Sequence, residues 1–263
     1  MKTEHFHYAL SIAFTIFLTP LSAHIDVTPE ETRIIGEWVW ENECAGSVLG
    51  LTSWNKNEEF ASMGIAHFIW HPSKANSSFA ESFPQLLKFL ESKEATIPQW
   101  LKKDSTCPWS DRESFLADIH SPRMKELRQL LSDTVELQCL FLIQRLENVL
   151  PLLCKKLSNR QAKHVRKQFE RVASTPEGVA VLVDYLNFKG EGLGSLSNYK
   201  GKGWGLLQVL QSMRGSKKGP KAINQFARRA KAMLRRRVHH APRNRHEEQW
   251  LAAWEKRIDR YTM

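Results

Sequence analysis

Helical periodicity along most of the chain constrains its fold more than any other feature. Beyond His71-Pro72, apolar residues recur at spacings of three and four, as on the buried face of an amphipathic helix. The segments with this pattern are 79–92, 121–150 with a break expected at Pro151, 174–188, 206–213, 222–238 and 244–261. No internal repeat or low-complexity tract interrupts them, so we predict a mostly α protein.

One more helix is predicted nearer the N-terminus, over residues 28–43. Thr28 is a favourable N-cap, Pro29 suits the first helical position, and Glu31 completes a capping box. Residues at helical spacing on one face of this segment are Ile35, Trp38, Val39, Asn42 and Glu43. Glu43 therefore extends the apolar face and is expected to be buried.

The only β element that we predict follows this helix. The strand-like segments "GLTSW" (50–54) and "ASMGIAHFIW" (61–70) flank the polar stretch "NKNEE", as in a hairpin. We therefore expect a mostly α (α+β) fold. Residues 24–263 would form a single domain, with a β-lobe near 50–71 and a helical lobe over 79–263.

Residues 1–23 have the succession of regions that is typical of a secretory signal peptide. Lys2 precedes an apolar run that ends at Leu21, and Ser22-Ala23 offers small residues at a cleavage site. The run is short for a membrane span, and a retained N-terminal anchor is the alternative. No later stretch reads as long enough to cross a membrane, so we expect no transmembrane segment in the mature chain. We predict a secreted or periplasmic protein.

Four cysteines would then lie in an oxidising compartment, where disulfides form. They are Cys44, Cys107, Cys139 and Cys154. Four thiols allow three pairings, and a buried free thiol is equally compatible with the apolar helix around Cys139. None of the four shows the CxxC spacing of a zinc site.

The sequence gives no motif for a metal or a nucleotide. His67 and His71 are four residues apart, but they lack the intervening glutamate of a zincin. The glycine-rich stretch 190–205 lacks the Lys-Ser/Thr ending of a phosphate-binding loop. We therefore expect no metal, no nucleotide and no other cofactor.

Positive charge is concentrated in the C-terminal third of the chain. The formal net charge is +10, and no acidic residue occurs between Glu191 and Glu247. Such a field favours a polyanionic partner, for example bacterial cell wall, nucleic acid or an anionic membrane. The alternative is a basic, solvated face that only aids solubility.

Glu43 is the first candidate for catalysis. Cleavage of a glycosidic bond commonly uses two carboxyl groups, one of which protonates the leaving oxygen. Burial favours the protonated form of a carboxyl group, and Glu43 has a buried position in the predicted helix. The structural alternative is that Glu41 and Glu43 only flank the end of the helix.

The segment around Glu43 resembles the phage-type lysozymes. A helix ending in Glu43, a short β-lobe, Ser62 and then "GIAH" (64–67) is similar to that family's pattern of Glu, hairpin, Thr and "GIGH". The resemblance implies that Glu43 is the general acid, that Ser62 positions water and that His67 ties the lobe together. The interval from Glu43 to Ser62 is longer than in the family, and no Asp occupies the hairpin. Glu58 or Glu59 would take its place.

A later segment resembles two other lysozyme-like families. "YKGKGWGLLQVLQSM" (199–213) is similar to stretches of plant-type chitinases and lytic transglycosylases in which a Gln lines the sugar groove. The resemblance implies that Gln208 binds glycan. Candidate neighbours in such a groove are His67, Tyr199 and the aromatic faces of Trp54 and Trp204, with Glu191 as a further acidic candidate.

These observations predict an exported glycoside hydrolase or lytic transglycosylase that cleaves peptidoglycan, or a chitin-like glycan. The basic charge suits peptidoglycan, whose lactyl and peptide carboxylates make it anionic. The alternative is a non-catalytic basic protein that docks on an anionic envelope surface or on nucleic acid through residues 214–245.

Overall fold

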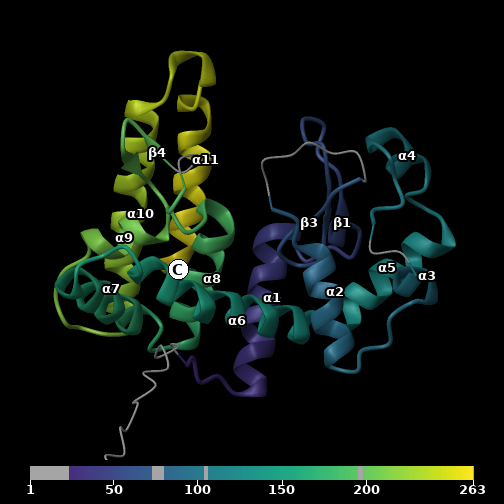
Figure 1. Cartoon of the computed structure of the whole chain (residues 1–263), viewed down its shortest axis with the longest axis horizontal. Helices are drawn as coiled ribbons and strands as arrows, with labels where there is room; N and C mark the ends of the chain where they lie inside the picture. The colour runs from purple at the N-terminus through teal and green to yellow at the C-terminus, as the bar shows by residue number, and fades with distance from the viewer. Residues whose placement is uncertain (1–23, 73–79, 104–105, 195–197, 263) are drawn as a thin grey trace, which may run out of the picture.

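The computed structural model describes residues 24–72, 80–103, 106–194 and 198–262. The signal peptide expected over residues 1–23 lies outside this range. Within it the chain is mostly helical, with one small antiparallel sheet near the N-terminus, as predicted (Figure 1).

The elements have the following bounds. The α-helices are α1 (Pro29–Cys44), α2 (Phe83–Ser92), α3 (Gln99–Lys103), α4 (Arg112–Ala117), α5 (Pro122–Asp133), α6 (Val135–Cys154), α7 (Asn159–Val172), α8 (Pro176–Lys189), α9 (Leu206–Ser212), α10 (Pro220–His240) and α11 (Glu248–Asp259). The 3₁₀ turns are η1 (Leu49–Leu51), η3 (Arg243–Arg245) and η4 (Arg260–Thr262). The strands are β1 (Thr52–Ser53), β2 (Ala61–Met63), β3 (Phe68–Trp70), β4 (Asn198–Tyr199) and β5 (Lys202–Gly203).

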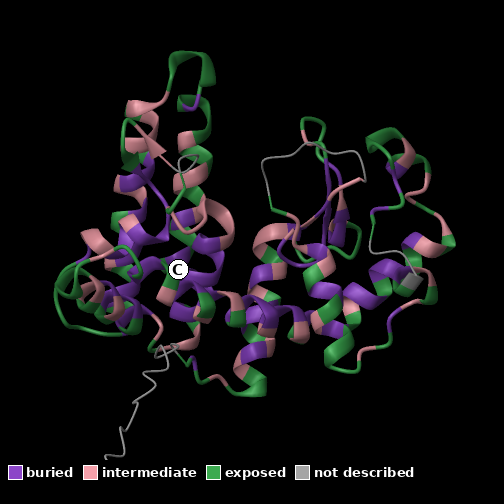
Figure 2. Cartoon of the chain, in the orientation of Figure 1, coloured by how far each residue is buried: buried purple, intermediate pink, exposed green. Residues whose placement is uncertain are grey.

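Two groups of elements lie on either side of α1 and α6. Figure 1 shows the sheet and α2 to α5 at the right, with α7 to α11 at the left. The buried residues form one cluster that includes both groups, and in Figure 2 they continue along α6. The long helix α6 packs against α1, α2, α7 and α8, so it is the common wall of the two groups.

Helix α1 begins and ends as its sequence predicts. The Thr28 hydroxyl accepts a hydrogen bond from the Glu31 backbone, and the Glu31 carboxylate accepts one from Thr28, which completes the capping box. Ile35 and Val39 are buried. Ala45 adopts a left-handed conformation with φ of 51° and ends the helix. The end of α1, which carries Glu43, is therefore firmly placed.

The β-lobe is a three-stranded antiparallel sheet in the order β1-β2-β3. Ser53 of β1 pairs with Ser62 of β2. The turn from Gly64 to His67 joins β2 to β3, and the buried side chain of Gln138 in α6 accepts a hydrogen bond of 3.0 Å from Ile65 of this turn. The turn is thereby fixed against the central helix.

The segment 121–150 differs from the single helix predicted for it. Thr134 leaves helical geometry, with φ of −114°, and its hydroxyl donates to the Leu130 carbonyl at 2.7 Å, so α5 and α6 are separate. Pro151 does not end α6, because Leu150 and Leu153 continue the buried face on both sides of it. The sequence analysis did not single out α7.

Helix α6 has the length and composition of a membrane span, contrary to the expectation that no later stretch would. More than half of its most apolar window is buried against the rest of the protein. These contacts are those of a core helix.

All four cysteines lie within the described residues and are buried free thiols. The disulfides that the sequence allowed are therefore not formed. Cys139 has the buried free thiol that was considered for it, and so do the other three cysteines.

The glycine-rich region 190–205 allows two backbone segments to pack directly on each other. Leu206 donates to the Gly190 carbonyl at 3.0 Å, and Leu207 donates to the Glu191 carbonyl at 3.1 Å. A Cβ atom at Gly205 would overlap the backbone of Gly192. The glycines of this region thus allow a close approach between two segments of the chain itself.

Gly205→Ala is therefore expected to lower the free energy of unfolding by about 2 kcal/mol or more through overpacking. The backbone at Gly205 has φ of −74°, which alanine adopts without strain, so the effect reports packing alone. Gly201→Ala is the matched control, because φ there is +72° and no atom lies within 4 Å of the added Cβ. Gly201→Ala should lower the free energy of unfolding by about 1 kcal/mol through backbone strain. Urea denaturation measures both, and equal costs would contradict the packing argument.

Candidate functional site

An open cleft of about 770 Å³ lies at the end of α1. Its walls come from the last turn of α1, the start of the β-lobe and the C-terminal segment. The lining residues are Trp38, Glu41, Asn42, Glu43, Cys44, Ala45, Gly50, Ser53, Asn55, His67 and Arg260. Of the residues proposed from the sequence, Glu43 and His67 line this cleft.

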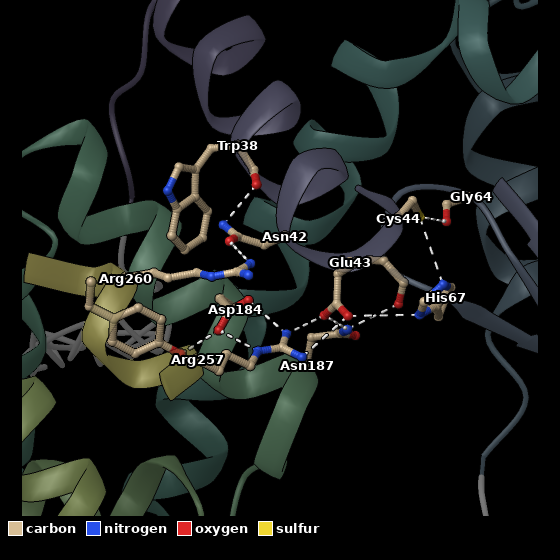
Figure 3. A network of polar contacts seen from close by, with 12 residues as sticks. Trp38, Asn42, Glu43, Cys44, Gly64, His67, Asp184, Asn187, Arg257 and Arg260 are labelled. Carbon is tan, nitrogen blue, oxygen red and sulfur yellow. Dashed lines mark hydrogen bonds and ion pairs between the residues drawn. The ribbon is translucent and has the colours of Figure 1, made fainter. Parts of the chain in front are cut away.

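The Glu43 side chain is only 9% exposed, which confirms its predicted position on the buried face. Its carboxylate accepts hydrogen bonds from both terminal nitrogens of Arg257, one of them at 3.3 Å, and from the Asn187 amide at 3.2 Å. His67 Nδ1 lies 3.7 Å from Glu43 Oε2. Figure 3 shows these groups converging on Glu43 from α8, α11 and the β-lobe.

Arg257 is shared between two carboxylates. Its Nε and a terminal nitrogen donate to Asp184 at 3.1 and 2.7 Å, and the Tyr261 hydroxyl donates to the same Asp184 carboxylate. Asp184 is 1% exposed, and burial raises the pKa of its carboxyl group, while Arg257 opposes that shift. The network places two acidic groups on one guanidinium, so the positive charge of Arg257 is essential to it.

Asn187 connects the helical lobe to the β-lobe at this point. Its amide nitrogen donates to the Ala66 carbonyl at 3.0 Å as well as to Glu43. The next residue, His67, has a left-handed backbone with φ of 53°. Asn187 thus fixes the distance between the acidic side chain and the turn that carries His67.

Cys44 and His67 lie close together, but the thiol is not activated. The Cys44 sulfur lies 3.7 Å from His67 Nε2 and 3.7 Å from the Gly64 carbonyl oxygen (Figure 3). Burial, with a smaller contribution from Glu43, raises the pKa of the Cys44 thiol to about 12. The C-terminal end of a helix also disfavours a thiolate. Nucleophilic chemistry by Cys44 is therefore not supported.

The other catalytic candidates from the β-lobe lie outside the cleft lining. Glu59 is exposed, and Glu58 accepts a hydrogen bond from Asn55 at 3.0 Å in the connection between β1 and β2. Ser62 is buried within the sheet, and the cleft hydroxyl belongs instead to its strand partner Ser53. The structure does not bring Glu58, Glu59 or Ser62 to Glu43 as the resemblance implies.

The aromatic candidates make contacts within the protein. Trp54 is buried, and its indole donates to the Glu58 carbonyl at 2.7 Å. Trp204 is buried against Tyr199, with ring centroids 4.7 Å apart. The Tyr199 hydroxyl donates to Glu247 at 2.7 Å. None of these three side chains lines the cleft.

Gln208 and Glu191 also lie outside the cleft lining. Gln208 donates to the Gly192 carbonyl at 3.0 Å, and its buried Oε1 has no hydrogen-bond partner among the described residues. Glu191 lies near Arg145 of α6, whose pKa is lowered by burial and raised in part by this carboxylate. Both residues therefore belong to the junction of α6, α8 and α9.

Most of the polar network around Glu43 was not predicted from the sequence. Asp184, Asn187, Arg257 and Tyr261 were not among the candidate residues. One signal was available: Asp184 interrupts the apolar run "VAVLVDYL" of a predicted helix, and a buried charge requires a partner. Nothing near Asp184 in the sequence identifies that partner.

Lys189, near this network, has an ammonium group in an unusual environment. It lies 3.7 Å from the ring centroids of both Phe188 and Trp254. These rings favour the charged form. Burial disfavours it, together with Arg237 and Arg257, and the balance lowers the pKa of Lys189 to about 6.

Lys189→Met is therefore expected to raise the free energy of unfolding at pH 7 by up to about 5 kcal/mol. Because the pKa of Lys189 is lowered in the folded protein, the unfolded chain binds the proton more tightly between pH 6 and the ordinary value of 10.5. The wild type should become more stable as the pH rises through this window, and the gain from methionine should shrink. Chemical denaturation at pH 5, 7 and 9 tests this, with exposed Lys256→Met as the control. A gain that does not change with pH would contradict the prediction.

Among the described residues, no group of three or more His, Cys, Asp or Glu side chains is placed to hold a metal ion. The chain was also compared with known proteins, and no family model, no curated protein and no solved structure matches it.

Proposed function

We propose that the protein is a lysozyme-like glycoside hydrolase or lytic transglycosylase that cleaves peptidoglycan, with Glu43 as the general acid. The observation that carries this proposal is a nearly buried carboxyl group at the wall of an open cleft. Arg257 and Asn187 fix this carboxyl group by donating hydrogen bonds to it. The resemblance of Glu43, Ser62 and "GIAH" to phage-type lysozymes supports the same role.

The arrangement favours a mechanism with one principal carboxyl group. Glu41 is the only other acidic residue among those that line the cleft. Residues two apart in a helix point in very different directions, so Glu41 does not face Glu43. To act as the general acid, Glu43 would first take up a proton against its ion pair with Arg257. It would then give this proton to the glycosidic oxygen as the bond from that oxygen to the anomeric carbon breaks. Glu43 would then accept the proton of the hydroxyl group that attacks the oxocarbenium-like centre.

Ser53 and Asn55 are placed to assist the second step. Both lie in the cleft lining contributed by the start of the β-lobe, and α1 contributes Glu43. A hydroxyl and an amide can each orient a water molecule or a sugar hydroxyl by hydrogen bonding. They would take the water-positioning role that the resemblance assigns to Ser62.

The direct test is to incubate the full chain with purified peptidoglycan and to follow turbidity and soluble muropeptides by mass spectrometry. Soluble fragments are expected. Fragments with the mass of water added would identify a hydrolase. Fragments lighter by one water would identify a transglycosylase, in which a hydroxyl of the same glycan attacks. Binding to the glycan without release of fragments would overturn the enzymatic proposal in favour of the non-catalytic alternative.

A further inference from the structure

One face of the helical lobe gathers exposed basic side chains from three elements. We call it the basic platform, and it consists of Arg160, Lys163 and Lys167 of α7, Arg214, Lys217 and Lys218 of the segment before α10, and Arg229 of α10. The three α7 residues are spaced by three and four, so they share one side of that helix. Figure 1 shows α7, α9 and α10 together at the left of the molecule.

Contacts in the structure bring these three elements together. Arg214 Nη1 lies 3.4 Å from His164 Nε2 of α7, and Gly219 donates to the Arg171 carbonyl at 3.3 Å. The segment between them therefore runs beside α7. Gln225 of α10 accepts a hydrogen bond from the Arg214 backbone at 3.3 Å, and Arg229 lies one turn beyond it.

A buried arginine fixes the platform from below. Arg171 is only 4% exposed, and its guanidinium donates to the carbonyls of Lys217 at 2.7 Å and Arg214 at 2.9 Å. It also donates to Gln225 at 3.1 Å and to Gln168. No carboxylate is among these partners. Burying a cation without a counter-charge is costly, and the charge adds to the positive potential of the surface above it.

The exposed platform residues also have no carboxylate partner within the described part of the chain. Elsewhere on α10, Arg235 pairs with Glu255 at 2.6 Å, Lys231 pairs with Asp259 and Arg237 pairs with Glu247 at 2.7 Å. The platform therefore joins seven exposed basic side chains without an ion pair among the described residues, and Glu170 is the acidic residue on the same side of α7. A surface that served only solubility would not require a buried arginine beneath it.

The chemistry of the platform favours an extended, charged polymer over a bilayer or a single-stranded nucleic acid. Proteins that bind membrane surfaces add exposed apolar side chains, and single-strand binders add exposed aromatic rings. The platform offers neither, since Phe169 and Phe226 are buried beneath it. Its residues can recognise repeated negative charge and little else.

We propose that the basic platform binds the anionic peptidoglycan polymer at a second site, away from the cleft. The proposal rests on the proposed function for its choice of polymer. No platform residue lines the cleft, so both sites can be occupied at once. Because the second contact is then made at high effective concentration, the protein would remain attached to the polymer between cleavage events.

The test compares two variants that change the net charge equally. The platform variant carries Lys163→Glu, Lys167→Glu and Lys217→Glu, and the control carries Lys88→Glu, Lys93→Glu and Lys102→Glu at exposed positions of the other lobe. Co-sedimentation of the full chain with purified peptidoglycan is measured from low to high salt. The platform variant should bind at least tenfold more weakly at low salt and show a shallower salt dependence, and the control should bind within twofold of wild type.

Cleavage of short, uncharged chito-oligosaccharides or soluble muropeptides separates this proposal from the proposed function. Equal cleavage of short fragments by wild type and platform variant, with weaker sedimentation of the variant, supports a second site. Equal loss of sedimentation in both charge variants would overturn it, because net charge alone would then explain binding. Platform-dependent binding to anionic vesicles or to duplex DNA, without binding to peptidoglycan, would also overturn it. If the wild type cleaved no fragments, the catalytic role proposed for the cleft would be contradicted, and the sedimentation result would still decide the role of the platform.

Discussion

Glu43→Gln is expected to lower the rate of muropeptide release about a thousandfold while leaving the protein folded. Glutamine keeps the size of the side chain and can still contact Asn187, but it has no acidic proton to give to the leaving oxygen. The fold should tolerate the change, because Arg257 keeps Asp184 as its counter-charge. Release of soluble fragments from purified peptidoglycan, at matched circular dichroism and unfolding temperature, measures the effect.

Glu41→Gln is the matched control for this prediction. Glu41 belongs to the same turn of α1 and lines the same cleft, but its side chain is exposed and has no part in the Arg257 network. It should retain activity within about threefold of wild type. A Glu43→Gln variant that turned over peptidoglycan at a tenth of the wild-type rate or faster would remove Glu43 from the role of general acid.

Arg257→Met is expected to lower the free energy of unfolding by about 3–5 kcal/mol at neutral pH. The substitution keeps much of the side-chain volume but leaves two carboxylates, Glu43 and Asp184, without their shared cation. The loss should shrink as the pH falls. Asp184 has a raised pKa in the folded protein because it is buried, so it takes up a proton before the unfolded chain does, and protonation relieves the repulsion.

Two further variants show whether the effect comes from the ion network. Arg260→Met, one turn along, removes an exposed arginine that makes a hydrogen bond to Asn42 at 2.8 Å, and it should cost less than about 1 kcal/mol. Asp184→Asn in the Arg257→Met background should recover part of the lost stability, which a double-mutant cycle by urea denaturation would quantify. A loss that is independent of pH and not rescued would mean that Arg257 acts through packing alone.

Local signals predicted the elements around the site well. The capping box, Pro29 and the spacing from Ile35 to Glu43 determine where α1 starts, which face is buried and where the acidic side chain lies. The polar stretch between two apolar segments located the β-lobe. These features depend on residues a few positions apart, so a single sequence contains them.

The partners of Glu43 could not be predicted in the same way. Arg257 is 214 residues distant in sequence and Asn187 is 144 residues distant, and neither belongs to a local motif. The role of the glycine-rich region could not be predicted either, because a close approach of backbone leaves the same pattern whether the neighbour is a ligand or the chain itself. The carboxylates of Glu58 and Glu59 were placed by analogy, and the hairpin here orients them differently.

The packing of α11 against the rest of the protein determines how long Arg257 stays in contact with Glu43. Within α11, Ile258 is the one buried residue and Leu251 and Trp254 are partly buried against the core, so few apolar side chains hold this helix to the rest of the protein. Segments of this kind detach in local opening events that need far less free energy than global unfolding. Each such event would carry Arg257 away from Glu43 and leave α1 and the β-lobe intact. The fraction of molecules in which Arg257 contacts Glu43 therefore depends on the docking of a helix that contributes no residue to the cleft lining.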